Sequence, residues 1–440
     1  MNNRENIKVL IMDAYCSSHV GNDALLDNSI HIIKQIFPNS EITIHAKTPD
    51  SFRYTLGINC KQILFSYPPS NILKKLQWLT VELIFMITQF INFKTFNISP
   101  HKLTFGYRKE LLKDFESSDF SISINGNMIN DSFRKFLPFY LFMIWLSHKC
   151  GNKVIIFPQS IGPLKRHWTK SLVSLVLNNC FCVTARDKPS IEELYSLKLK
   201  IPILNSSPDV AVIQQTMSTN DLNIFLKNNG ISINSEKFWI GLTVSAWVEC
   251  GVDSQHYLQS IVDALIIVSK LSNISVIIMP ANMPAYGNDP SDYNTSIQVL
   301  DSISPACETV ILKPEVISAR LFKSITSQLD MFISTHMHAS ILSTMAGTPT
   351  ITINTQRKLK GFMSLIGQSR YSLDITDLTV EAIIAAITDI KKRSHIIRDE
   401  LKKACVKQTK DLDVYISELR EQTIRHISTN TSYVSGIFSD

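Results

Sequence analysis

Short runs of β-branched and apolar residues alternate with segments of helical periodicity along most of this chain. Strands that are apolar on both sides are typical of a parallel sheet covered by helices on both faces. The first half of the chain supplies five such runs: Ile7–Met12, Glu41–Ala46, Ser118–Ile124, Lys153–Phe157 and Phe181–Ala185. A second series follows: Phe238–Val244, Ser275–Met279, Thr309–Leu312, Met331–Ser334 and Thr350–Ile353.

The two series indicate two domains, and the chain length agrees. Its 440 residues exceed the roughly 250–300 at which a single core stops growing. Residues 213–236 are rich in Asn and Ser and predict a short helix and a linker. We therefore predict an α/β fold with two Rossmann-like doubly wound domains, 1–215 and 237–440, the second ending in a charged helical segment. Ligands of such folds bind beyond the carboxyl ends of the strands, so the active site is expected in the cleft between the domains.

Composition excludes several classes of protein. A hydrophobic fraction of 45% and a charged fraction of 19% are incompatible with wholesale disorder. The net charge of +6 is mild and the basic residues are scattered, so we expect no nucleic-acid partner, whereas an anionic substrate or an anionic membrane surface is compatible. The eight cysteines form no C-x-x-C pair and no signal peptide precedes the first strand. We expect reduced, inert thiols and a cytoplasmic protein.

Two apolar stretches, Trp78–Phe93 and Phe136–Leu146, raise the question of a membrane. The first has 16 residues and contains Glu82 and Gln89, whereas a span needs about 20 mostly apolar residues. We expect a pair of buried core helices. Four basic residues flank the two stretches: Lys74, Lys75, Arg134 and Lys135. They leave open a patch that contacts the inner face of the cytoplasmic membrane.

Polar residues follow several of the expected strands. After the first strand, Gly21 permits a tight turn, and the N–H groups of the next helix can bind an anion; a plain turn capped by Asn22 or Asp23 is the alternative. After the third strand, Gly126 lets the backbone approach a ligand between Asn125 and Asn127.

Three further junctions carry polar pairs. Gln159-Ser160 follows the fourth strand, and Arg186-Asp187 follows the fifth, where a surface ion pair is the alternative reading. His336 and His338 lie at a strand-to-helix junction and are turn residues or metal ligands. No carboxylate or Cys stands at ligand spacing beside them, so we expect no metal.

Taken together, the order of these motifs resembles that of the polysaccharide pyruvyl transferase family, from about residue 8 to 367. Seven features match the family's pattern: Gln159–Pro163, Arg186-Asp187, Ser190, Pro208-Asp209, Ser334–Ala339, Gly347–Pro349 and Lys358 before Gly361. Asn22 replaces the family's Asp, and the glycine-rich turn is matched imperfectly by Asn125-Gly126-Asn127. His338 matches the family's histidine, whereas His336 stands where the family has Arg.

The resemblance implies transfer of a ketal pyruvyl group from phosphoenolpyruvate to a sugar of a cell-surface polysaccharide, such as a capsule, or its lipid-linked precursor. It implies no cofactor and a fold similar to GT-B-type glycosyltransferases. Arg186 and His338 would be catalytic. The expected substrate-binding residues are Lys358, His336, Gln159, Ser160, Gly21, Asn22, Gly126 and Asn127.

The residue chemistry fits that reaction. Arg186 and Lys358 come from opposite halves and would clamp the phosphate and carboxylate of the donor. His338 suits a general acid, because imidazole titrates near neutral pH. His336 would bind phosphate only when protonated, so His336→Arg is expected to keep or lower the KM for the donor at alkaline pH.

Two alternatives remain at this point. The same cleft could hold the diphosphate of a nucleotide-sugar donor, which would make the protein a glycosyltransferase. The chain could also be an inactive scaffold of a polysaccharide-assembly apparatus, which the departures at Asn22 and His336 and the two apolar stretches favour.

Overall fold

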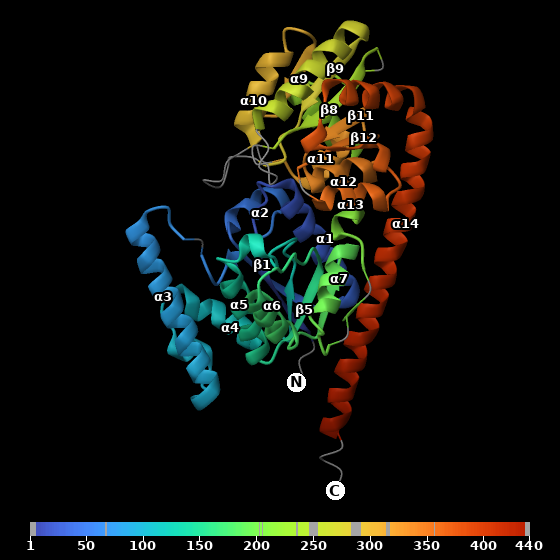
Figure 1. Cartoon of the computed structure of the whole chain (residues 1–440). Helices are drawn as coiled ribbons and strands as arrows, with labels where there is room; N and C mark the ends of the chain where they lie inside the picture. The colour runs from blue at the N-terminus through green and yellow to red at the C-terminus, as the bar shows by residue number, and fades with distance from the viewer. Residues whose placement is uncertain are drawn as a thin grey trace.

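The framework of the molecule consists of two wholly parallel β-sheets, one above the other in Figure 1. The computed structural model describes residues 6–66, 68–201, 203–204, 206–234, 236–245, 254–282, 292–313, 317–355 and 357–435. The lower sheet has seven strands in the order β3-β2-β1-β4-β5-β6-β7. The upper sheet has six, in the order β10-β9-β8-β11-β12-β13. Both orders are of the doubly wound Rossmann type, so the predicted fold class is confirmed.

The strands of the lower sheet are β1 Lys8–Ala14, β2 Glu41–Ala46, β3 Lys61–Gln62, β4 Phe120–Ser123, β5 Lys153–Gln159, β6 Cys182–Ala185 and β7 Ile203–Leu204. Those of the upper sheet are β8 Phe238–Thr243, β9 Ile274–Ile278, β10 Glu308–Ile311, β11 Met331–Ser334, β12 Thr350–Asn354 and β13 Ser372–Asp374. The ten expected strands are present, with ends shifted by a residue or two. The strands that the sequence did not predict, β3, β7 and β13, are two- or three-residue edge strands with too few residues to show a pattern.

The helices and helical turns of the first half are α1 Val20–Ile36, α2 Pro49–Leu56, α3 Ile72–Ile91, η1 Asn92–Phe96, η2 Pro100–Leu103, α4 Tyr107–Ser117, η3 Asp131–Phe133, α5 Leu137–Lys149, α6 His167–Leu177, α7 Lys188–Ser196, η4 Val210–Ile213 and α8 Thr219–Asn228. Those of the second half are α9 Ser254–Leu271, α10 Asp292–Ile303, α11 Ala319–Thr326, α12 Met337–Met345, α13 Arg357–Leu365, η6 Ser369–Tyr371, η7 Ile375–Asp377 and α14 Val380–Ser435.

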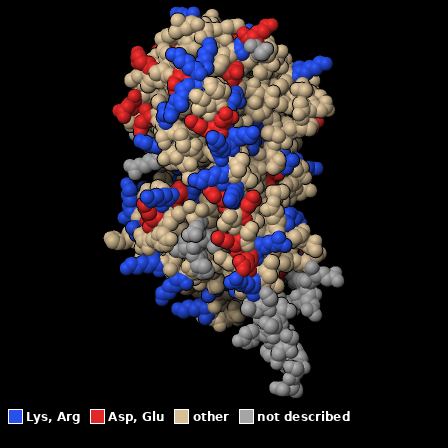
Figure 2. All heavy atoms as spheres, turned by 90° about the vertical axis from the view of Figure 1, so that its right-hand side faces the viewer, with Lys and Arg blue, Asp and Glu red and all other residues tan. Residues whose placement is uncertain are grey.

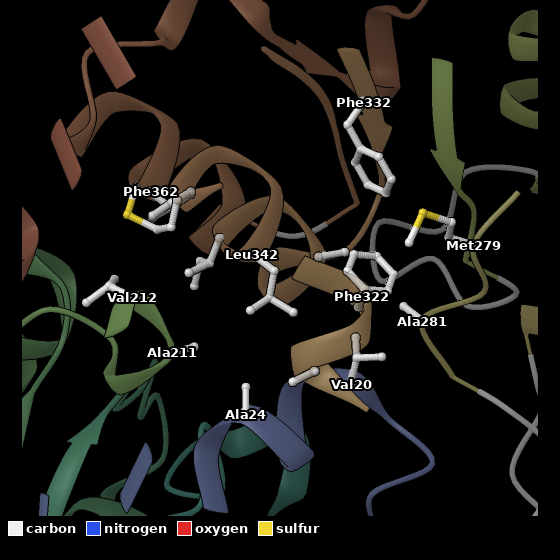
Figure 3. Close-up of a cluster of buried hydrophobic side chains, with 14 of the residues drawn as sticks. Val20, Ala24, Ala211, Val212, Met279, Ala281, Phe322, Phe332, Leu342 and Phe362 are labelled. Atoms are coloured by element: carbon white, nitrogen blue, oxygen red, sulfur yellow. The ribbon is translucent and has the colours of Figure 1, made fainter. Parts of the chain in front are cut away.

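The two halves pack against each other through a continuous apolar core beside the cleft. Figure 3 shows Val20 and Ala24 of α1 facing the helices of the upper domain, among them Phe322 of α11 and Leu342 of α12. Polar contacts continue this junction: the Arg320 guanidinium donates two hydrogen bonds of 2.8 Å to the Asp27 carboxylate. The side of the cleft that this junction closes is therefore fixed by packing, and the site lies next to it.

Helix α14 links the two halves a second time. It begins in the upper domain and runs down the side of the lower one (Figure 1). There Tyr415 meets Phe157 of β5, and the ring of His426 lies 5.4 Å from that of Phe181. The sequence prediction placed the C-terminal helical segment in the second domain, 237–440. In the structure this helix packs on the lower domain as well. On the molecular face that carries α14, Lys and Arg are interspersed with Asp and Glu (Figure 2).

The cysteines in the described part of the chain are all free. Cys16, Cys180 and Cys182 are buried, and burial raises the pKa of the Cys182 thiol to about 12, so it stays protonated at neutral pH. Cys250 lies outside the described residues.

The two apolar stretches behave differently. Helix α5 is buried under the lower sheet, with Leu137, Ile144 and Leu146 fully enclosed, so the core prediction is confirmed for Phe136–Leu146. For Trp78–Phe93 the core prediction is wrong. Helix α3 stands at the edge of the molecule (Figure 1), and only 22% of its most apolar window is buried. The helical run Ile72–Phe96 has 25 residues and, among the described helices, is long and apolar enough to cross a membrane by length and composition.

Candidate functional site

The site lies where the strand order of each sheet reverses, between β1 and β4 below and between β8 and β11 above. Loops diverge at such points and leave a crevice at the carboxyl ends of the strands. Here the two crevices face each other around a cavity of about 290 Å³. The lower half lines it with His19, Asn22, Leu25, Asn125, Gly126, Asn127 and Arg186. The upper half lines it with Ser245, Asn282, Asp292, Thr335, His336, Met337, His338, Thr355 and Lys358.

A second cavity of about 360 Å³ adjoins the first. The two share Arg186, Met337 and Lys358 as lining residues. The second extends between α7 and α13, where Pro189 and Phe362 contribute to its walls. A ligand in each cavity would therefore meet the other ligand beside Arg186 and Lys358.

Arg186 is the most tightly held residue of the site. It follows β6 and is 4% exposed. Its Nη1 forms an ion pair with the Asp209 carboxylate, and its Nε donates to Ser160 Oγ over 3.0 Å. Its Nη2 is buried without a hydrogen-bond partner in the described residues. A buried donor of this kind costs free energy unless a ligand accepts its hydrogen bond. The surface ion pair considered for Arg186 and Asp187 is therefore wrong.

Asp209 supplies a permanent negative charge behind Arg186. Burial alone would raise its pKa, but the positive charge of Arg186 and the contact with His338 outweigh burial and hold the pKa well below its usual range. Its Oδ2 lies 3.5 Å from His338 Nε2. One carboxylate thus orients both an arginine of the lower half and a histidine of the upper half.

His338 reaches that position because of a glycine on the opposite side of the cleft. It is the second residue of α12, and a Cβ on Gly21 would lie only 2.2 Å from its Nδ1. Gly21 lies inside α1, so it is required for this close approach rather than for a turn. Burial lowers the pKa of His338 despite the nearby Asp209. Its imidazole is therefore held mainly neutral at neutral pH.

His19 completes a group of three imidazoles. Its ring centroid lies 6.0 Å from that of His336 and 6.3 Å from that of His338. It caps α1, because its Nδ1 accepts the Gly21 N–H over 3.1 Å. The cap is therefore neither Asn22 nor Asp23, the residues considered in the alternative reading of this turn. Burial, with smaller contributions from the other two histidines, lowers its pKa to about 3. Within the described residues, no cluster of His, Cys, Asp or Glu has the arrangement of a metal site.

His336 is held by two polar neighbours. Its Nε2 lies 3.0 Å from Asp292 Oδ2, and its Nδ1 lies 3.2 Å from Thr335 Oγ1. Asp292 is 4% exposed in the side chain and begins α10. The position that differs from the family's arginine thus has an acidic partner.

The remaining predicted residues divide into two groups. Asn22, Gly126, Asn127 and Lys358 line the first cavity, as do Arg186, His336 and His338. Gln159 is fully buried at the end of β5, and its carbonyl accepts the Arg186 N–H over 3.2 Å. Ser160 lies behind Arg186 and donates to Asp187 Oδ2 over 2.7 Å. Gln159 and Ser160 therefore position Arg186 instead of lining the cavity.

Three residues of the site were missed as site residues by sequence reasoning: His19, Asp209 and Asp292. His19 stands two positions before Gly21, and Asp209 belongs to the Pro208-Asp209 pair that matches the family's pattern, but neither was given a role in the site. Asp292 follows a segment with no strand or glycine signal, and its role depends on the folding of the upper domain around His336.

Comparison with known proteins decides the family. The sequence model of polysaccharide pyruvyl transferase matches residues 19–357, which covers most of the chain and every residue that lines the first cavity except Lys358, the residue directly after the match. The chain belongs to the polysaccharide pyruvyl transferase family. It is therefore an enzyme of that class. No curated protein sequence matches the chain.

Solved structures resemble this pyruvyl transferase family member in fold. Anabaena Alr3699/HepE in complex with UDP-glucose has a TM-score of 0.56 at 12% identity, over 96% of this chain and 100% of that one. The UDP-GlcNAc 2-epimerase from Neisseria meningitidis bound to UDP-GlcNAc has a TM-score of 0.56 at 12% identity, over 94% and 100%. Glycyrrhiza uralensis UGT73P12 has a TM-score of 0.56 at 10% identity, over 98% and 99%. These likenesses confirm two Rossmann-like domains facing a cleft.

Proposed function

We propose that this enzyme transfers the pyruvyl group of phosphoenolpyruvate to two hydroxyls of a sugar, forming a cyclic ketal in a cell-surface polysaccharide or its lipid-linked precursor. The family supports a polysaccharide acceptor. One observation carries the choice of donor: Arg186 is buried with an unpaired Nη2 in the cavity that also contains Lys358 and three imidazoles. Guanidinium and ammonium groups from opposite sides suit a small, multiply charged anion.

The reaction requires a proton, two additions and a leaving group. Carbon C3 of the donor takes up a proton and becomes a methyl group, while one sugar hydroxyl adds to C2 and gives up its proton. The second hydroxyl then displaces phosphate from C2, and its proton leaves with the phosphate or a nearby base. The products are the ketal and inorganic phosphate, so atoms and charge balance without a cofactor.

We assign the proton donation to His338. Its Nε2 lies 3.5 Å from Asp209 Oδ2, so a protonated imidazole has a buried counter-charge. The donor itself brings negative charge next to the imidazole, and an adjacent anion favours the protonated form. Burial lowers the pKa of His338, so donor binding would be accompanied by proton uptake. A general acid of this kind contributes roughly 10²–10⁴-fold to the rate.

The adjoining cavity is the proposed acceptor site. It shares Arg186 and Lys358 with the first cavity, so hydroxyls bound there would approach the C2 carbon of the donor. Phe362 and Pro189 line it with apolar surface, and sugar rings pack their C–H faces against such surfaces. A lipid-linked acceptor would place the reaction in the cytoplasm, at the inner face of the membrane.

The test is a donor screen. The enzyme, a membrane extract containing lipid-linked oligosaccharides and one donor are incubated together, and released phosphate, released UDP or GDP and acceptor mass are measured. Phosphate release from phosphoenolpyruvate that depends on the acceptor, with a pyruvyl gain in acceptor mass, supports the proposal. Release of UDP or GDP would contradict the proposal and indicate a glycosyltransferase instead. The structurally similar HepE, solved in complex with UDP-glucose, is the reason to test this alternative. No turnover with any donor would favour an inactive scaffold.

A further inference from the structure

Helix α3 turns its carboxylate, its buried amide and part of its aromatic surface inward, and it carries a large apolar surface outward. Glu82, Phe85, Gln89 and Asn92 form its buried stripe. The opposite side consists of exposed residues, which we call the apolar face: Ile72, Leu73, Leu76, Leu79, Val81, Leu83, Ile84, Ile87, Phe90 and Ile91. A helix on a water-soluble protein normally turns its apolar stripe to the core. An exposed apolar surface of this size indicates an interaction site.

Specific polar contacts fix this orientation. Glu82 is 1% exposed and forms an ion pair with Arg108 of α4. Gln89 Nε2 donates to Thr104 Oγ1 over 3.1 Å. Rotating the helix to bury its apolar face would leave the Arg108 guanidinium without its partner and expose the amide contacts. The outward apolar face is thus built into the fold.

The chain continues the apolar face after α3. Phe96, Ile98, Leu103, Phe105 and Tyr107 are all exposed, with Phe105 at 90%. These residues lie in or between η1, η2 and the start of α4, a segment that the Gln89–Thr104 and Glu82–Arg108 contacts hold against α3. The apolar surface therefore extends beyond one helix.

The charges around the apolar face have one sign. Between Asn71 and Lys109 the sole carboxylate is Glu82, which is buried. The exposed charged residues of this segment are Lys74, Lys75, Lys94, Lys102 and Lys109. An apolar helical face edged by lysines is the pattern of a helix that lies in the interface of an anionic membrane.

We propose that the apolar face of α3 docks this enzyme onto the surface of an anionic lipid bilayer. The helix lies on the membrane and does not cross it, because its inner stripe is tied to the protein body by Glu82 and Gln89. A second copy of the chain fits less well. A symmetric dimer through this face would place the lysines of one copy against those of the other, with no exposed carboxylate in the segment to pair with them.

Aromatic contacts link α3 to the part of the lower domain that borders the cleft. Trp78 of α3 packs against Phe139 with ring centroids 5.2 Å apart, and Phe85 of α3 packs against Phe65 at 5.9 Å. Phe65 and Phe139 line a small apolar cavity, and Asn125 lines both this cavity and the first cavity of the cleft. An aromatic layer therefore connects the membrane-facing helix to the cleft. The docking proposal itself does not depend on which donor the enzyme uses.

The test is flotation of the purified full-length protein with vesicles. One set contains phosphatidylglycerol and phosphatidylethanolamine, and the other contains phosphatidylcholine alone. We expect binding to the anionic vesicles that weakens when NaCl is raised, because the lysine contribution is screened. Failure of the wild-type protein to bind the anionic vesicles would overturn the proposal.

Two variants and a control locate the surface. Ile84→Asn with Ile87→Asn is expected to lower vesicle binding at least about tenfold by removing apolar contact, and Lys74→Gln with Lys75→Gln by several-fold. Leu175→Asn with Leu271→Asn makes the same kind of change at exposed sites on α6 and α9 and is expected to bind as the wild type does. Equal binding by the Ile84/Ile87 variant and the control would overturn the proposal.

Two further readouts separate the outcomes. All variants change exposed side chains, and circular dichroism is used to check that each variant is folded. A dimer in light scattering that Ile84→Asn with Ile87→Asn converts to a monomer would assign the face to a second copy and contradict membrane docking. Calorimetric binding of phosphoenolpyruvate is measured in parallel. Vesicle binding without binding of phosphoenolpyruvate would contradict only the proposed donor. Binding of phosphoenolpyruvate without vesicle binding would contradict only the docking proposal.

Discussion

The two sides of the cleft carry different kinds of charge. On the lower side, Arg186 is held in place by Asp209 and Ser160. Burial lowers the pKa of His19 to about 3, so its imidazole is neutral at neutral pH. On the upper side, His338 and His336 each stand beside a carboxylate, and Lys358 comes from α13. The lower side thus holds a preformed anion site at Arg186, which Lys358 of the upper side completes, whereas His338 of the upper side is the group assigned to proton transfer. Donor binding is therefore shared by the two sides, with its buried charge on the lower one, and proton transfer is assigned to the upper one.

The largest effect is expected from the lower side. Arg186→Gln removes the charge that would bind the donor and leaves Asp209 buried without its partner. We expect kcat/KM for phosphoenolpyruvate to fall by about 10⁴-fold or more, measured as phosphate release. Thermal unfolding is followed alongside, because loss of a buried ion-pair partner also lowers stability. Arg186→Lys keeps the positive charge but loses the planar guanidinium that can donate two parallel hydrogen bonds. We expect its kcat/KM to lie between those of the wild type and Arg186→Gln. A loss of under tenfold in Arg186→Gln would show that this side does not bind the donor.

On the upper side, His338→Gln is expected to act on the rate. The amide can still donate to Asp209, but it cannot supply a proton to carbon. We expect kcat to fall about 10³-fold with little change in the KM for the donor. Steady-state kinetics distinguish the two parameters. If KM rose and kcat were unchanged, His338 would belong to the binding side and the comparison would break down.

Contact between the sides is tested at Gly21. Gly21→Ala would place a methyl group 2.2 Å from His338 Nδ1, so the helices must shift. We expect a loss of about 1–3 kcal/mol in the free energy of unfolding and a parallel loss of activity. Gly361→Ala is the matched control, since its Cβ meets no atom within 4 Å and the residue is in a helix. Urea unfolding of both variants gives the measurement; equal stabilities would mean that the two sides are not closely packed here.

The smallest effect is a pH dependence from His19. Its pKa is about 3 in the folded protein and about 6.5 when unfolded, so in this range the unfolded chain binds the extra proton. Stability is therefore lost as pH falls below about 6.5, by up to about 1.4 kcal/mol per pH unit. His19→Asn keeps a capping side chain and removes the titration. Urea unfolding at pH 7 and pH 5 should show a loss about 2 kcal/mol smaller in the variant; an identical loss would mean that His19 is not held neutral.

The fold could be predicted from sequence because each buried strand is a short apolar run between recognisable helices. The same signal failed for α3. Trp78–Phe93 and Phe136–Leu146 have similar apolar composition, yet α5 is enclosed and α3 is exposed. What separates them is the spacing of Glu82, Gln89 and Asn92, which form one polar stripe. That stripe faces inward only because Arg108 and Thr104, from the next segment, are there to pair with it.

The sequence could predict those site residues that directly follow strands, because the carboxyl ends of parallel strands lie at the same edge of a sheet. Arg186, His336, His338 and Lys358 lie around one cavity because parallel strands bring their carboxyl ends together. The sequence could not show that Gly21 serves the approach of His338 rather than a turn. Nor could it show that Asp209 joins Arg186 to His338, since these three residues meet only when the two domains are packed.

The most direct test of the central claim is a crystal structure of the enzyme with phosphoenolpyruvate. The account predicts the donor in the first cavity, with an anionic group on Arg186 Nη2 and carbon C3 facing the His338 imidazole. Density for the donor away from Arg186 and His338, in a crystal where the cleft is open to solvent, would contradict it.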